Sequence, residues 1–311
     1  MPVNNPHPHP LPFLTLRDCL RYGVSRFNQA QLCFGHGSPD ALDEAAYLLL
    51  HTLHLPLDKL DPFLDARLLP AEIERCVNVI DRRVTERIPA AYLTNEAWLA
   101  NYRFYVDPRV IVPRSFLAEL IPTFFQPWVD PDQVENILEL CTGSACLAIM
   151  LADAFPQAAL DASDLSSDAL AVAERNVKDY ELSHRITLIE SDVFANIPVG
   201  KKYDIILSNP PYVNSQSMEN LPEEFLQEPS MALAGGMDGM DVVRRIIAGA
   251  AEHLEPDGVL IVEIGHERDF AEAAFSELEL TWLTTSAGDD MVFLITAEQL
   301  QAYARSYPNA T

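Results

Sequence analysis

Cysteine is scarce in this sequence, and the spacing of the few cysteines excludes two common structural uses. The chain of 311 residues has five cysteines, an odd number, and no two of them form a C-x-x-C pair. This arrangement argues against a disulfide framework and against a zinc site. Because free thiols persist in a reducing compartment, the sequence predicts a cytoplasmic protein without a bound metal.

Long apolar runs are also missing, although apolar residues make up 49% of the sequence. No stretch reaches the roughly 18 apolar residues that a membrane-spanning helix needs, so we expect no membrane contact. Residues 1–12 are rich in Pro, His and Asn and lack the apolar core of a signal peptide. We therefore predict a disordered tail over residues 1–14.

Basic residues are few, since 21 Lys and Arg stand against 46 Asp and Glu and give a net charge of −25. Duplex DNA repels such a surface, because binding to DNA depends on neutralising its phosphates, so we expect no direct DNA binding. An acidic protein is suited to a basic protein partner, since complementary fields accelerate encounter. The same charge is also compatible with a simpler role in keeping the protein in solution.

The periodicity of apolar residues divides the rest of the chain into three parts. Apolar residues recur at helical spacing through 15–90, which predicts a small helical domain, and Asp40 is expected to cap one of its helices. Aromatic residues between 91 and 115 indicate short strands, which we interpret as a β-hairpin linker. Residues 116–311 are expected to form a second, larger domain.

The second domain alternates strands with helices, which argues for an α/β fold with a doubly wound, mainly parallel sheet. Its last two strands are separated by only a short stretch, so they are expected to pair as an antiparallel hairpin. The expected strands are 134–140, 158–164, 185–191, 203–208, 258–264, 281–285 and 291–296.

The tetrapeptide Asn209-Pro210-Pro211-Tyr212 follows one of these strands directly. Two prolines cannot continue a central strand, so the tetrapeptide lies at the carboxyl edge of the sheet, where such folds bind their ligands. The side-chain carbonyl of Asn209 and the backbone carbonyl of Pro210 can accept both N–H groups of a planar NH2, while Tyr212 lies on its flat face. Taken alone, the tetrapeptide is equally compatible with a simple turn.

Polar residues also end the three preceding strands. Glu139 and the turn from Cys141 to Ala145 follow the first, but only one glycine of G-x-G-x-x-G is present and no phosphate-binding lysine follows. S-adenosylmethionine carries no phosphate and does not need those glycines. Asp164 could accept both ribose hydroxyls, although a single aspartate there is more often a helix cap. The residues expected to bind this cofactor are Glu139, Cys141, Thr142, Gly143, Ser144, Ala145, Asp164, Asp192, Val193 and Asn209.

Over nearly its whole length the chain resembles the protein-(glutamine-N5) methyltransferases, which methylate a glutamine of peptide release factors or of a ribosomal protein. The resemblance implies a class I S-adenosylmethionine-dependent methyltransferase with a Rossmann-like, seven-stranded sheet over 116–311, and a helical domain that recognises the substrate. It implies catalytic roles for Asn209, Pro210 and Tyr212, and substrate binding by these residues and Pro211. Further matching segments include Asp164-Leu165-Ser166, Asn176, Glu228-Pro229, Ala232 to Gly239, and Val262-Glu263-Ile264-Gly265.

Two segments resemble one branch of this family, which acts on large-subunit ribosomal protein number three. They are Pro113-Arg114-Ser115, where release-factor enzymes tend to read Pro-Arg-Pro, and Cys141, where those enzymes tend to have glycine. That substrate is a very basic protein, in agreement with the charge argument. The alternatives are release factors, N6-adenine methylation of DNA or RNA, and a binding scaffold that has lost its cofactor.

Two residues depart from the family pattern. Ala145 stands where the family usually has glycine. Alanine is well tolerated there only if φ is negative, so we expect a small local shift of the turn with cofactor binding retained. Val193 stands where release-factor enzymes often carry an aromatic residue, which predicts less stacking on adenine.

Overall fold

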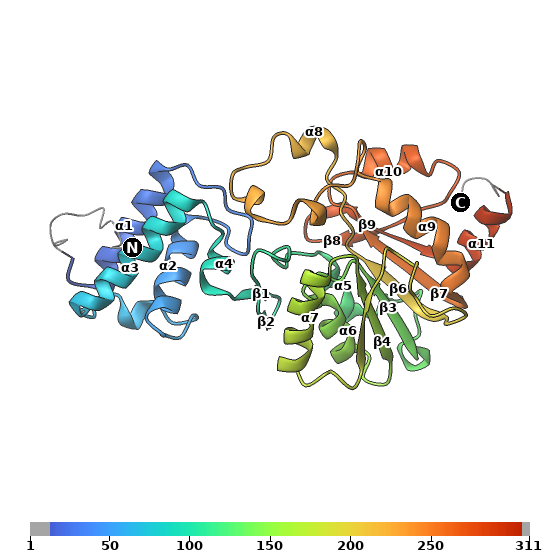
Figure 1. Cartoon of the computed structure of the whole chain (residues 1–311), viewed down its shortest axis with the longest axis horizontal. Coiled ribbons are helices and arrows are strands. Elements are labelled where there is room, and N and C mark those ends of the chain that lie inside the picture. The colour runs from blue at the N-terminus through green and yellow to red at the C-terminus, as the bar shows by residue number, and fades with distance from the viewer. Residues whose placement is uncertain (1–12, 307–311) are drawn as a thin grey trace. The chain divides into compact units, whose positions relative to one another are not determined.

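The computed structural model describes residues 13–306, which separate into two compact units between Thr94 and Asn95 (Figure 1). Most of the predicted tail, residues 1–12, lies outside the described residues. The other two tail residues belong to the fold, because Phe13 is buried and the carbonyl of Leu14 accepts a hydrogen bond from the amide of Leu68. The helical unit therefore begins earlier, and ends four residues later, than the range 15–90 read from the sequence.

The first unit is a small bundle of helices. Thr15 and Asp18 form a capping box at the start of α1, and Asp40 caps α2 as predicted by accepting hydrogen bonds from two backbone amides. The apolar faces of α1, α2 and α3 meet in one core, which also encloses an ion pair between Arg83 and Glu44 at 2.7 Å. The helices are α1 (Leu16–Gln29), α2 (Ala41–Thr52), α3 (Pro70–Glu86) and α4 (Ala90–Thr94), with a 3-10 turn, η1 (Asp61–Phe63).

The second unit begins with the expected hairpin, β1 (Ala97–Leu99) and β2 (Tyr102–Phe104). The hairpin groups with the second unit and does not stand apart as a linker. It is fastened there by the hydroxyl of Tyr180, which accepts from and donates to the backbone of Arg103.

All seven predicted strands of the second unit are present in one sheet. Their spatial order is β5-β4-β3-β6-β7-β9-β8, in which the first five run parallel and β9 is antiparallel to both β7 and β8. The predicted hairpin of the last two strands is thereby confirmed. The strands are β3 (Asn136–Leu140), β4 (Ala159–Asp164), β5 (Ile186–Glu190), β6 (Tyr203–Ser208), β7 (Leu254–Glu263), β8 (Thr281–Thr285) and β9 (Gly288–Thr296).

Helices cover both faces of this sheet. Alternate strand residues face two separate cores, one that includes α5 and α6 and one that includes α9 and α11. Short 3-10 turns are η2 (Ile121–Thr123), η3 (Pro131–Gln133), η4 (Phe225–Gln227) and η5 (Ser230–Ala232). The helices are α5 (Leu117–Leu120), α6 (Cys146–Ala154), α7 (Ser167–Asp179), α8 (Ser215–Met218), α9 (Asp241–His253), α10 (Arg268–Ala274) and α11 (Ala297–Ser306).

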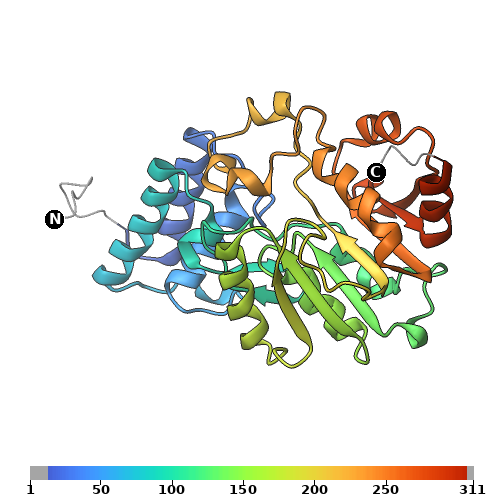
Figure 2. The same ribbon diagram turned by 45° about the vertical axis from the view of Figure 1, so that its right-hand side comes forward.

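The parallel arrangement decides where polar side chains gather. Figure 2 shows β3, β4 and β6 side by side, and because these strands share a direction with β5 and β7, all five carboxyl ends meet at one edge. Within residues 13–306, no helix combines the length and the apolar character needed to cross a membrane.

Candidate active site

The tetrapeptide from Asn209 to Tyr212 begins directly at the carboxyl end of β6; we call it the clamp. The hydroxyl of Ser208, the last residue of the strand, donates to the carbonyl of Leu140 at 2.9 Å and ties β6 to β3. Asn209 is half-buried, and its side chain makes no hydrogen bond to another residue within 13–306, while Pro210 is buried. The side-chain amide of Asn209 therefore keeps its hydrogen-bonding capacity for a ligand.

Tyr212 is packed against the end of β7. Its ring lies so close to Gly265 that a Cβ on that residue would be 2.7 Å from the ring. Burial, followed by the neighbouring carboxyl of Glu263, raises the pKa of Tyr212 above its usual range. The clamp thus presents a neutral tyrosine with a fixed ring.

The backbone of the clamp is supported from behind by glycines. Val213 donates to the carbonyl of Leu233 at 2.8 Å and accepts from the amide of Gly235 at 2.9 Å. A Cβ on Gly235 would lie 2.7 Å from the Cα of Tyr212 and 2.8 Å from the carbonyl oxygen of Pro211. Gly239, with a φ of +80°, approaches the carbonyl of Tyr212 even more closely. Gly235 and Gly239 are therefore explained by contact with the clamp, whereas Gly236 lies against the side chain of Asp241.

A second support joins two segments that are far apart in the sequence. The guanidinium of Arg114 donates to both carboxylate oxygens of Glu228, at 2.6 and 2.7 Å, and the amide of Val112 donates to the same side chain at 2.9 Å. Arg114 also lies 5.2 Å from the ring centre of Phe225. This bidentate pair fixes the chain that follows the clamp, because its geometry allows little rotation.

Glu263, at the end of β7, is a second buried carboxyl group that supports this edge. The hydroxyl of Ser115 donates to Glu263 at 2.5 Å, and the amide of Leu117 does so at 3.3 Å. Burial raises the pKa of Glu263 to about 7, against the opposing effect of the Ser115 hydrogen bond. Sequence reasoning assigned no site role to Glu228 or Glu263. The rule applied to the first four strand ends would have found Glu263 on the fifth.

The turn after β3 is held by Glu139. The hydroxyl of Thr142 donates to Glu139 at 2.5 Å and the amide of Ala148 donates to it at 3.0 Å. Burial raises the pKa of Glu139 to about 8. The Nδ2 group of Asn176 fastens the same turn by donating to the carbonyl of Ser144 at 2.9 Å. Glu139 therefore fixes the turn through these contacts, and its contact with the cofactor stays a prediction.

The turn has left-handed backbone at alternate residues, with φ of +59° at Cys141, +56° at Gly143 and +62° at Ala145. The expectation of a negative φ at Ala145 was therefore wrong. The contacts of Glu139 and Asn176 hold the turn in the conformation that glycine prefers, so the alanine has to adopt it. The strain is roughly 1–2 kcal/mol for a residue with a Cβ, and Cys141 bears it as well.

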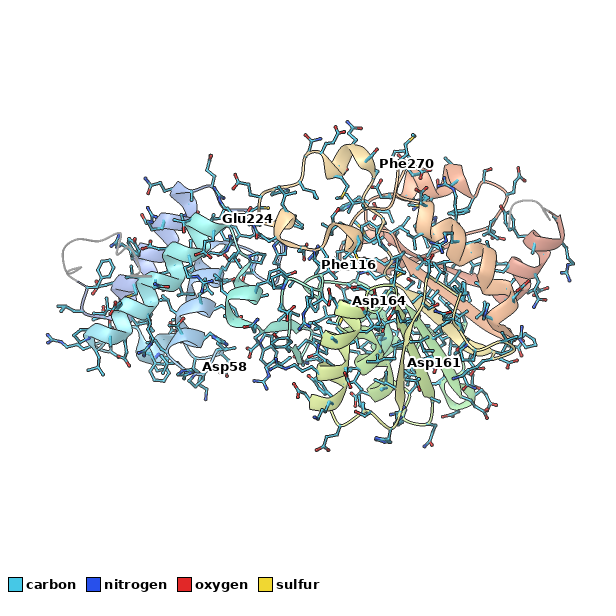
Figure 3. The ribbon with its side chains drawn as sticks, in the orientation of Figure 1. Asp58, Phe116, Asp161, Asp164, Glu224 and Phe270 are labelled. Atoms are coloured by element: carbon cyan, nitrogen blue, oxygen red, sulfur yellow. The ribbon has the colours of Figure 1, made fainter. Side chains whose placement is uncertain are left out.

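Asp164 stands at the carboxyl end of β4 (Figure 3) and contacts the same turn. One carboxylate oxygen accepts from the amide of Gly143 at 2.8 Å and the other from the amide of Ser166 at 2.9 Å. The N-cap of α7 is Ser166 itself. Burial raises the pKa of Asp164. Each oxygen retains a lone pair that can accept a ribose hydroxyl.

The end of β5 carries two residues predicted to bind the cofactor, Asp192 and Val193. Asp192 forms an ion pair with Arg245 at 2.8 Å, and both side chains are about half exposed. Arg245, on the first turns of α9, was not anticipated from the sequence. Val193 is buried and packs in the core beside α9, so the structure gives it a packing role.

The chemical character of this edge fits S-adenosylmethionine. Asp164 and Asp192 place two carboxyl groups at neighbouring strand ends, which disfavour a phosphate and can accept hydrogen bonds from the hydroxyl and amino donors of this ligand. Among residues 13–306, no three or more His, Cys, Asp and Glu side chains are grouped as metal ligands. A groove of about 540 Å³ between α7 and β5 holds none of the predicted site residues.

Comparisons with known proteins agree with this geometry. The methyltransferase small domain family matches residues 120–238. A ribosomal protein uL3 glutamine methyltransferase from Burkholderia pseudomallei is 61% identical over 302 residues, which cover 95% of this chain and 98% of that protein. One of the same name from Bordetella pertussis is 60% identical over 287 residues, covering 92% and 96%.

Two solved structures show weaker similarity. A ribosomal protein L11 methylase from Lactobacillus delbrueckii aligns with a TM-score of 0.40 and 20% identity, over 58% of this chain and 76% of that one. The 16S rRNA N2 G1207 methyltransferase of T. thermophilus, in complex with AdoMet and guanosine, aligns with a TM-score of 0.45 and 19% identity, over 65% and 49%.

Proposed function

Because this chain belongs to the ribosomal protein uL3 glutamine methyltransferase family, we propose that its substrate is a glutamine side chain of uL3, which it methylates on N5. The chain is an S-adenosylmethionine-dependent methyltransferase. The observation that carries the proposal is the clamp, in which the Asn209 side chain has no partner within 13–306 and stands beside the carboxyl-rich strand ends.

The residues that would hold the cofactor are those at the ends of β3, β4 and β5. Asp164 would accept the ribose hydroxyls, Asp192 the adenine amino group, and the turn from Cys141 to Ala145 would approach the ligand with its backbone. When bound, S-adenosylmethionine supplies an electrophilic methyl group on a positively charged sulfur.

The clamp would hold the substrate amide. The side-chain oxygen of Asn209 and the carbonyl of Pro210 would accept its two N–H groups, while Tyr212 lies on the amide plane and Pro211 shapes the turn. An amide nitrogen is a poor nucleophile, so this fixed orientation is the main contribution of the protein. After methylation the nitrogen gives up one proton to water, which requires no further base.

The net charge of −25 supports a basic ribosomal protein as the partner and disfavours direct DNA binding. The helical unit would recognise the protein outside the target glutamine, because the clamp contacts only an amide. Such a substrate supports a cytoplasmic location for the enzyme.

The proposal is tested with labelled S-adenosylmethionine and three separate acceptors: purified uL3, a peptide release factor and DNA. We expect label in uL3 at a glutamine. Label in the release factor or in adenine, with none in uL3, would establish one of the alternative functions.

The clamp itself is tested by Asn209→Ala and Asn209→Gln. Both should reduce methyl transfer at least about a hundredfold, because an accepting carbonyl is removed or displaced. The dissociation constant for S-adenosylmethionine, measured by calorimetry, should change less than about threefold. Full activity of Asn209→Ala would contradict the assigned role.

A further inference from the structure

We propose that residues 213–240, here called the post-clamp segment, form a docking surface for a basic, extended stretch of uL3 next to the target glutamine. This inference rests on the proposed function and adds to it the surface that the flanking substrate residues contact. The post-clamp segment connects the clamp to α9 and contains only α8 and two 3-10 turns. Connections of this length with so little regular structure are uncommon and often functional.

Exposed apolar side chains are concentrated on this segment. Leu226, Met231 and Met237 are exposed by 63%, 50% and 85%. A single exposed apolar residue is ordinary, but three within twelve residues beside a catalytic clamp point to an interaction surface. Methionine side chains are flexible and polarisable, so they adapt to the varied residues of an extended peptide.

The segment is held firmly despite its irregular backbone. Glu228 is fixed by Arg114 and Val112, as described above. Asn214 accepts from the amide of Ser217 at 2.9 Å and donates to Glu267 at 2.8 Å, which anchors the segment at α10. Because these bonds already order the surface, little conformational entropy is lost when a partner binds.

The charge of this region selects the partner. From residue 203 to residue 243 the sequence has no Lys, Arg or His. Among its carboxyl groups, those of Glu219 and Glu223 are exposed, whereas those of Glu224, labelled in Figure 3, and Glu228 are buried. Three carboxyl groups of this region pair with arginines outside it: Glu228 with Arg114, and both Asp238 and Asp241 with Arg244. The acidic residues of the post-clamp segment are Glu219, Glu223, Glu224, Glu228 and Asp238, and Asp241 follows directly after it.

A basic peptide is therefore the favoured occupant, since its charge complements the segment and its apolar side chains can cover the exposed ones. A second copy of this chain would bring another net charge of −25 against the same surface. Nucleic acid would be repelled for the same reason. A peptide whose glutamine lies in the clamp would have the post-clamp segment next to it, because Gly235 and Gly239 of that segment contact the backbone of Pro211 and Tyr212.

The test compares Leu226→Ser/Met231→Ser with wild type on purified uL3. We expect KM for uL3 to rise about tenfold or more while kcat stays within about twofold, because the surface binds substrate outside the reacting amide. The dissociation constant for S-adenosylmethionine and the melting temperature should not change. Val199→Ser is the matched control, since Val199 is fully exposed in the loop that precedes β6, at the opposite edge of the sheet, and should leave KM unchanged.

A second variant tests the charge argument without touching apolar packing. Glu219→Lys, at an exposed position after α8, should raise KM for uL3 several-fold and weaken its dependence on salt. A KM within about twofold of wild type in both variants overturns the docking proposal. The docking proposal is also overturned if a loss of cofactor affinity or a lower melting temperature is large enough to explain the higher KM for uL3. If wild-type enzyme does not methylate uL3 at all, the proposed function itself fails.

Discussion

At the scale of single residues, Cys141 and Ala145 hold backbone conformations that glycine adopts more easily. Both have φ near +60° in the turn that follows β3. The turn keeps this shape because its neighbours are fixed through Glu139 and Asn176. The turn therefore accommodates side chains at two positions with left-handed backbone, and each of these residues carries the strain.

Replacing Ala145 tests this interpretation. Ala145→Gly relieves roughly 1–2 kcal/mol of backbone strain in the folded state. This gain is offset because the folded state loses a buried methyl group and the unfolded chain becomes more flexible. We expect the free energy of unfolding in urea to change by less than about 1 kcal/mol, and the cofactor dissociation constant by less than about threefold. Ala145→Val should cost more than about 2 kcal/mol, because a branched side chain is poorly tolerated at positive φ. Much tighter cofactor binding by the glycine variant would show that Ala145 distorts the site.

Glu139 predicts a pH dependence of stability. Its pKa rises from the ordinary value of 4.5 to about 8 in the folded protein, mainly through burial. The folded state then holds the proton more tightly than the unfolded state, so the free energy of unfolding falls as pH rises from about 4.5 to about 8. Glu139→Gln should remove part of this fall, roughly 1–3 kcal/mol. Urea unfolding of both proteins at pH 5 and pH 8.5 measures it, and equal slopes would contradict the assignment.

At the scale of elements, the clamp depends on a loop that packs against its backbone. Gly239 and Gly200 have nearly equal φ, +80° and +79°, but different surroundings. A Cβ on Gly239 would lie 2.2 Å from the carbonyl oxygen of Tyr212, whereas a Cβ on Gly200 would have no neighbour within 4 Å. The two positions therefore separate backbone strain from close contact.

Gly200→Ala should cost about 1 kcal/mol of unfolding free energy, from strain alone, and leave methyl transfer unchanged. Gly239→Ala should cost at least about 2–3 kcal/mol and lower kcat at least about tenfold, because the clamp backbone has to move. Urea unfolding and methylation of uL3 provide the two measurements. Equal effects of the two substitutions would mean that the loop does not position the clamp.

At the scale of the whole molecule, the net charge of −25 governs the encounter with substrate. Attraction between an acidic enzyme and a basic protein is screened over about 10 Å at 0.1 M salt. We expect kcat/KM for uL3 to fall at least about tenfold between low and moderately high salt. Cofactor affinity, measured under the same conditions, serves as the control and should change much less. A flat salt profile would indicate that charge contributes only to solubility.

The sequence by itself determined the elements of the second unit and the location of the clamp. Short apolar runs that lie between segments of helical periodicity predicted all seven strands of the sheet. This prediction succeeds because the pattern depends on neighbouring residues and reflects which side chains are buried. The prolines after residue 208 marked the end of β6 for an equally local reason. Asp40 was predicted to cap a helix because its carboxylate can accept from backbone amides. The amides of Leu42 and Asp43, in the first turn of α2, donate to it and confirm the prediction.

The contacts that hold the site together depend on segments that are distant in the sequence and meet only in the folded chain. Arg114 and Glu228 are 114 residues apart, and Ser115 and Glu263 are 148 residues apart, so no local pattern indicates that they meet. The positive φ of Ala145 and the pairing of Asp192 with Arg245 likewise depend on neighbours supplied by other elements. Local residues specify where a strand ends, but contacts between distant segments fix backbone conformation and pair charges after the chain has folded.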